Sequence, residues 1–210
     1  MRANVCCRPE ADAIRERILE GNVSNLDAQN KAAGLFVDLV AARAGTGRAV
    51  HAETAIAAAA RLSGSLLLRS FDLDINKFEP GSVLLSEKAN EEGPQLINIL
   101  GSMLQNFGVV LEKSKLGGSN ALRGEEPRLS VVQSLALLQE DAMRIAEENR
   151  LSLKEAAQSA AMGAAFIVKE CAGSIGGEVG FNVAIYGIIE GSKTVPPRLQ
   201  LPKNPSWKFW

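Results

Sequence analysis

Alanines recur at helical spacing in two long segments, and this pattern limits what the chain can fold into. Residues about 48–71 include four consecutive alanines, at 57–60, within a stripe of Ala, Ile and Leu. Residues about 153–172 carry alanines in pairs, three or four positions apart. Alanine has the highest helix propensity, and its small side chain lets neighbouring helices approach closely. The two segments therefore predict helices in a tightly packed, helical fold.

Apolar residues elsewhere in the chain also follow helical periodicity. They predict further helices at about 10–20, 26–44, 94–112 and 129–150. Gly21-Asn22 is expected to end the first of these helices. The 94–112 segment is apolar on nearly every side, so we expect it to be the central helix of the bundle.

Glycines interrupt residues 173–191, where Phe, Val, Ile and Tyr lie between them. We favour a helix over about 175–190, lined by small residues, and a pair of strands is the alternative. Gly173 and Gly177 are four residues apart, a spacing that lets a second helix approach closely. They are therefore predicted interface residues, either within the chain or across a dimer.

These elements predict an all-α fold of six to seven helices in an orthogonal or layered bundle. Residues 1–193 would form this single helical domain, and residues 194–210 would form an extended, proline-rich C-terminal arm. The expected core comprises aliphatic and aromatic residues from most of the helices: Leu39, Ile56, Leu66, Leu100, Leu104, Phe107, Leu135, Leu138, Ile145, Phe166 and Ile185.

The composition limits which cellular location and which classes of partner we expect for this protein. The formal net charge is −1, which lacks the overall basic excess typical of proteins that bind nucleic acid along their surface. No stretch approaches about 20 apolar residues, so no membrane span is expected. The chain has three cysteines, no zinc-ligand spacing and no signal peptide at its start, which favours reduced thiols and a cytoplasmic protein.

His51 is the single histidine of the sequence, so a catalytic mechanism that needs histidine would have to use it. Gly45, Gly47 and Arg48 precede it at the expected start of a helix, where free backbone N–H groups can bind an anion. Glu53 follows two positions later, although positions i and i+2 of a helix do not share a face. We therefore expect His51 to have a structural role. If the chain does bind a small ligand here, the candidate ligand-binding residues are Gly45, Gly47, Arg48, His51 and Glu53.

Two acidic residues could extend that set. Asp72 and Asp74 stand at the other end of the 48–71 helix, and a ligand-dependent or metal-dependent site with His51 would require the helix to bend or to pair with a second copy. The spacing after Asp72 does not match a calcium-binding loop. We predict no metal site and no cofactor.

The C-terminal arm is the most specific feature of the sequence. It ends in Trp207, Phe209 and Trp210, and residues 193–210 hold four lysines and arginines with no acid. Large apolar side chains left in water are unusual for a monomer. The arm could fold back on its own helices, dock on a second subunit, or bind another protein or nucleic acid.

The leading interpretation is a soluble, self-associating helical protein, a homodimer that acts as a protein–protein interaction module. The shortage of catalytic arrangements favours a protein without enzymatic activity. One alternative is a small-ligand or metal-dependent enzyme with a site near Arg48, His51, Glu53, Asp72 and Asp74. The weakest alternative is nucleic-acid binding through the basic, aromatic arm.

Overall fold

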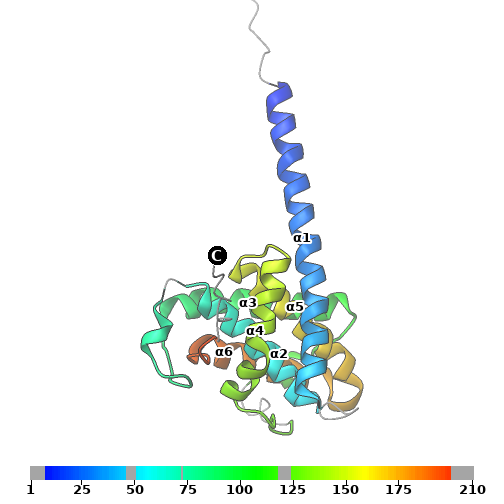
Figure 1. Ribbon diagram of the computed structural model, residues 1–210. Helices are drawn as coiled ribbons and strands as arrows, with labels where there is room; N and C mark the ends of the chain where they lie inside the picture. Colours follow the sequence, from blue (N-terminus) through cyan, green and yellow to red (C-terminus); the bar gives the residue numbers. More distant parts are fainter. Residues whose placement is uncertain (1–7, 46–50, 72, 118–123, 200–210) are drawn as a thin grey trace, which may run out of the picture.

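The computed structural model describes residues 8–45, 51–71, 73–117 and 124–199, with the backbone alone described for 8–24. These residues form an all-α, layered bundle, as predicted (Figure 1). They contain six α-helices and no strand, apart from one isolated bridge between Val83 and Thr194. The helices are α1 (Arg8–Ala44), α2 (Ala52–Arg69), α3 (Glu87–Asn106), α4 (Val131–Glu148), α5 (Leu153–Ile175) and α6 (Gly177–Lys193), with short 3-10 helices η1 (Ile75–Lys77) and η2 (Lys113–Lys115).

The central helix is α2. Every residue from Glu53 to Leu68 is buried, and the other five helices all contact α2. Its small residues, above all the alanines at 57–60, contribute to this arrangement because they let neighbouring helices approach closely. The prediction that the 94–112 segment would be central is wrong: α3 buries one face, at Leu96, Leu100 and Leu104, and exposes polar residues on the other.

Helix α6 packs backbone to backbone against α2. A methyl group at Gly64 would lie 2.2 Å from the carbonyl oxygen of Ile188, and one at Gly191 would lie 2.1 Å from that of Arg61. The 175–190 segment is therefore helical, and its glycines do permit a close approach. On α6, Gly187 and Gly191 permit this approach to α2. Of the two predicted interface glycines, Gly177 would place a methyl group 2.8 Å from Cγ1 of Val109, whereas one at Gly173 would meet nothing within 4 Å.

Helix α1 is continuous from Arg8 to Ala44, so the predicted break at Gly21-Asn22 is wrong. A glycine inside a helix costs only about 1 kcal/mol relative to alanine, which flanking helix formers can absorb. The N-terminal part of α1, drawn in blue, projects beyond the bundle (Figure 1). Its C-terminal part packs against α5 and α4.

The first residues of the predicted arm lie on the bundle. The backbone amide of Val195 donates to Ser82 (2.9 Å), and the amide of Gly81 donates to the carbonyl of Val195 (2.8 Å). Val195 is buried, and the carbonyl oxygen of Pro197 accepts hydrogen bonds from Arg69 and Gln139. Trp207, Phe209 and Trp210 lie outside the described residues.

Most of the predicted core is buried, and one member is exposed. Phe166 is 40% exposed, so its assignment to the core is wrong. It lies on the face of α5 that borders an open groove, as described below. Phe107, Ile145 and Ile185 are half-buried, and the other predicted core residues are buried: Leu39, Ile56, Leu66, Leu100, Leu104, Leu135 and Leu138.

Candidate functional site

His51 and Glu53 come together at the start of α2. Nε2 of His51 lies 2.9 Å from Oε2 of Glu125 and 3.4 Å from Oε2 of Glu53, and its Nδ1 lies 2.8 Å from Oγ1 of Thr54. His51 precedes the first helical turn and has an extended backbone. Positions i and i+2 point to different faces only inside a helix. Because His51 lies before the helix, its side chain can meet that of Glu53.

This cluster holds the 124–128 segment against α2. The backbone amide of Glu125 donates to Oε1 of Glu53 (3.1 Å), and that of Arg128 donates to Oγ1 of Thr54 (2.9 Å). Glu53 and Thr54 are buried, so these hydrogen bonds also satisfy polar oxygens that are removed from water. Both ring nitrogens of His51 contact side chains of this cluster, and Glu53 and Thr54 also bind the backbone of the 124–128 segment.

Replacing Thr54 with valine should destabilise the fold, because the change preserves shape but removes the hydroxyl. The Arg128 amide and Nδ1 of His51 would both lose a partner, at a cost of about 1–3 kcal/mol in the free energy of unfolding. Urea denaturation measures this change. Ser174→Ala is the control, since that exposed hydroxyl only donates to the carbonyl of Cys171. Equal effects of the two substitutions would contradict the assignment.

Of the other residues predicted for this site, the structure describes only Gly45 and Asp74. Gly45 directly follows α1, and Gly47, Arg48 and Asp72 lie outside the described residues. Asp74 lies beyond the far end of α2, where it pairs with Lys77 (3.2 Å). The 18 residues of α2 span about 27 Å, so Asp74 and His51 belong to opposite ends of the bundle.

Cys171 lies close enough to this cluster for the charge of Glu53 to affect its thiol. Burial raises the pKa of the Cys171 thiol, and the negative charges of Glu53 and Glu170 raise it further. The thiol therefore stays protonated at neutral pH, which disfavours a nucleophilic role. Among the described residues no group of three or more His, Cys, Asp or Glu side chains is placed to hold a metal ion.

A second polar network surrounds Arg61, which lines a hollow of about 570 Å³ between α2, α6 and the 124–130 segment. Nε of Arg61 donates to Oε2 of Glu190 (2.8 Å), and its Nη1 donates to the carbonyl of Leu129 (2.6 Å) and to Oγ of Ser134 (3.2 Å). Arg61 is buried, and these contacts satisfy it. Sequence reasoning missed this network because its members are far apart in the chain.

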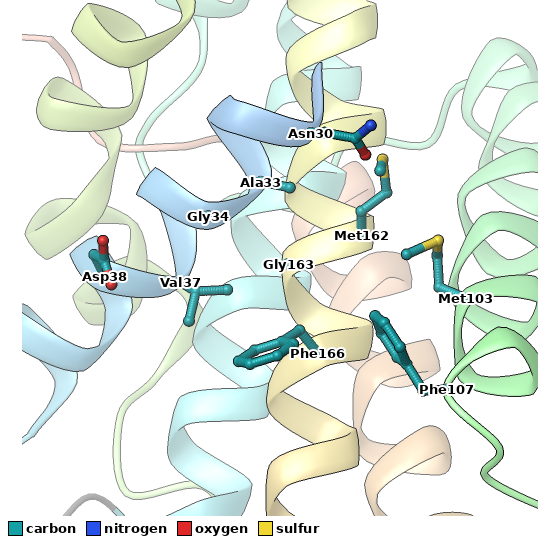
Figure 2. Close-up of a pocket in the computed structure, with 10 residues that line it drawn as sticks. All are labelled: Asn30, Ala33, Gly34, Val37, Asp38, Met103, Phe107, Met162, Gly163 and Phe166. Carbon is teal, nitrogen blue, oxygen red and sulfur yellow. The ribbon is translucent and has the colours of Figure 1, made fainter. Parts of the chain in front are cut away.

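An apolar groove of about 400 Å³ opens between α1, α3 and α5, and Figure 2 shows its lining. Met103 on α3 and Phe107, which directly follows α3, face Met162 and Phe166 on α5. The two phenylalanine rings meet edge to face, with centroids 6.1 Å apart. We call this the Met/Phe groove; its lining is Asn30, Ala33, Gly34, Val37, Asp38, Met103, Phe107, Met162, Gly163 and Phe166.

The floor of the groove is formed where α1 crosses α5 closely. A methyl group at Gly163 would lie 3.0 Å from the carbonyl oxygen of Ala33, so larger residues would push the two helices apart. The sequence contains a signal for the groove: methionine precedes phenylalanine by four residues at the end of α3 and again within α5. Residues four apart share a helix face, but two such pairs face each other only in the fold.

The sequence matches no known family model, and neither curated proteins nor solved structures give a match. None of the helices among the described residues combines the length and apolar character needed to cross a bilayer.

Proposed function

We propose that this protein is a self-associating interaction module, in which the Met/Phe groove of one copy receives the C-terminal aromatic segment of a second copy. The observation that carries the proposal is the groove itself. Methionine and phenylalanine line it, and Phe166 is 40% exposed although it belongs to an otherwise well-packed helix. Flexible methionines adapt to the shape of an inserted apolar group, which is why they are frequent at binding surfaces.

The occupant is suggested by the chain beyond the described residues. Residues 200–210 contain Trp207, Phe209 and Trp210, whose rings carry a large apolar area. Eleven extended residues reach about 36 Å, enough to leave one bundle and enter another. Lys203 and Lys208 lie in the same stretch, and the exposed carboxylate of Asp38 on the groove wall has no ion pair among the described residues.

A second copy is the partner that makes use of both features at once. Each copy carries one groove and one aromatic segment, so two copies related by a two-fold axis can form two identical contacts. Each contact would bury aromatic area against Met and Phe side chains. Exchange of a terminal segment is an easy route to such dimers.

Phe166→Glu in the full chain should convert the dimer to a monomer, measured by light scattering at micromolar concentration. A carboxylate in the apolar groove would be desolvated without a partner, which should weaken association about 100-fold or more. Leu137→Glu is the matched control, because Leu137 is 41% exposed on α4, away from the groove. A wild-type chain that is monomeric, or a Phe166→Glu chain that remains dimeric, would overturn the proposal.

A mixing experiment separates exchange between copies from docking within one copy. The first chain carries Phe166→Glu, and the second carries Trp207→Ser, Phe209→Ser and Trp210→Ser. Each should be monomeric alone. Mixed, the intact groove of the second chain should bind the intact segment of the first and give a heterodimer. If the segment docks on its own bundle, the mixture stays monomeric.

A further inference from the structure

Arg69, in the last turn of α2, is a half-buried cation without a described counter-ion. Its Nη2 donates to Oε1 of Gln139 (2.7 Å) and to the carbonyl oxygen of Pro197 (3.0 Å), both of which are uncharged acceptors. Its Nε is buried and has no hydrogen-bond partner. Among the described residues no carboxylate pairs with Arg69. Charged groups removed from water are normally paired, so this arrangement calls for a negative charge from elsewhere.

A second arginine is held beside the first. The carbonyl of Pro197, which Arg69 binds, also accepts from Nε2 of Gln139 (3.0 Å), and the neighbouring Val195 is buried. These contacts fix the backbone that carries Arg198. Arg69 and Arg198, together with Asn76 and Leu199, line a hollow of about 410 Å³. Two like charges are thus directed to one space, with no acid among its described lining residues.

The surroundings of Arg69 add positive rather than negative potential. A neighbouring hollow also includes Arg69, together with Lys88, Lys154 and Glu92. Glu92 is already paired with Lys154, whose Nζ lies 2.7 Å from its Oε2. Lys88 lies over the ring of Phe71, 6.0 Å from its centroid. The negative end of the α2 dipole offsets part of the charge on Arg69 but supplies no acceptor for its Nε.

We propose that the hollow between Arg69 and Arg198 binds the oxyanion group, phosphate or carboxylate, of a small molecule. A guanidinium presents a planar fork of N–H donors that matches two oxygens of either group. Asn76 also lines the hollow, and its side-chain amide can donate a further hydrogen bond. The size of the hollow lies within the range of small-molecule sites. This site is separate from the Met/Phe groove and does not depend on self-association.

Calorimetric titration of the full chain with inorganic phosphate, and separately with citrate, tests the proposal at constant ionic strength. The wild-type chain should bind at least one of the two, and the comparison shows which oxyanion the hollow prefers. Arg198→Gln should weaken that binding about tenfold or more, because it removes one of two charge-assisted partners. Arg128→Gln is the control, since it makes the same change of charge at an exposed arginine outside the hollow.

Arg69→Lys keeps the charge but removes the fork, so it should also weaken binding while preserving the fold. Binding by neither anion in the wild-type chain, or equal binding by wild type and Arg198→Gln, would overturn the proposal. Asp72, three residues after Arg69, lies outside the described residues. Phosphate binding that appears only in an Asp72→Asn chain would identify the Asp72 carboxylate as the counter-charge, and would also overturn it.

Discussion

Gly191→Ala is expected to destabilise the protein by about 3 kcal/mol or more, although alanine is the better helix former. The new methyl group would lie 2.1 Å from the carbonyl oxygen of Arg61 and 2.9 Å from its Cα. Both atoms belong to the backbone of the central helix, so the clash is relieved only if α2 and α6 move apart. Overpacking of a well-packed interior costs about 1–3 kcal/mol, and more where backbone must shift. The change in unfolding free energy can be measured by urea denaturation.

Gly173→Ala is the matched control for this prediction. Gly173 lies in α5, is exposed, and would place its methyl group in open space. The same substitution should therefore stabilise the protein by about 0.5–1 kcal/mol through helix propensity and the smaller entropy of the unfolded chain. Opposite signs at the two positions would support the backbone contact between α2 and α6. A neutral or stabilising Gly191→Ala would show that the two helices are not in contact there.

Arg61→Met should cost about 2–4 kcal/mol, while Glu190→Gln should cost less than about 1 kcal/mol. Methionine keeps the apolar stem of Arg61 but leaves the carbonyl of Leu129 without its donor, and the Glu190 carboxylate without its counter-charge. Removal of one member of a buried charge pair is strongly destabilising. The Glu190 side chain is 42% exposed and can be hydrated. The expected loss of unfolding free energy for Arg61→Met is therefore smaller than for a fully buried charge pair.

The asymmetry between the two substitutions is the informative result. Arg61 is 6% exposed and has three partners on three parts of the chain, whereas Glu190 has water as an alternative partner. Urea denaturation of both single variants and the double variant gives the coupling energy of the pair. If Glu190→Gln costs as much as Arg61→Met, the carboxylate rather than the backbone and serine contacts accounts for the role of Arg61.

The helical segments were predictable from the sequence, but two predictions about them were wrong: the helix end at Gly21-Asn22 and the choice of the central helix. Apolar spacing and alanine content are local properties, so they correctly predicted the all-α bundle and a helix over about 175–190, which the structure has at Gly177–Lys193. The end expected at Gly21-Asn22 was wrong because a glycine ends a helix only where the following backbone turns away. The central position was wrongly assigned to the 94–112 segment. A helix is enclosed when other helices surround it, and the composition of a helix does not determine which helices pack around it.

The candidate sites were less predictable, for the same reason. His51 and Glu53 were identified from the sequence, but Thr54 and Glu125 were not, and Glu125 is more than 70 residues from His51 in the chain. Phe166 was assigned to the core by its helical spacing, and it instead borders the groove with Phe107. Met103 and Met162 each precede a phenylalanine by four residues, and this spacing is visible in the sequence. The spacing does not show that the two Met–Phe pairs face each other.

The sequence by itself determined the helices, because propensity, capping and apolar periodicity act between residues a few positions apart. Ser130 and Ser152 illustrate this, since each caps its helix through a residue three positions later. Only the tertiary structure decided that α2 is enclosed, that Gly191 touches Arg61, and that two arginines share one hollow. Those relations join residues separated by most of the chain, and they depend on how whole helices pack together.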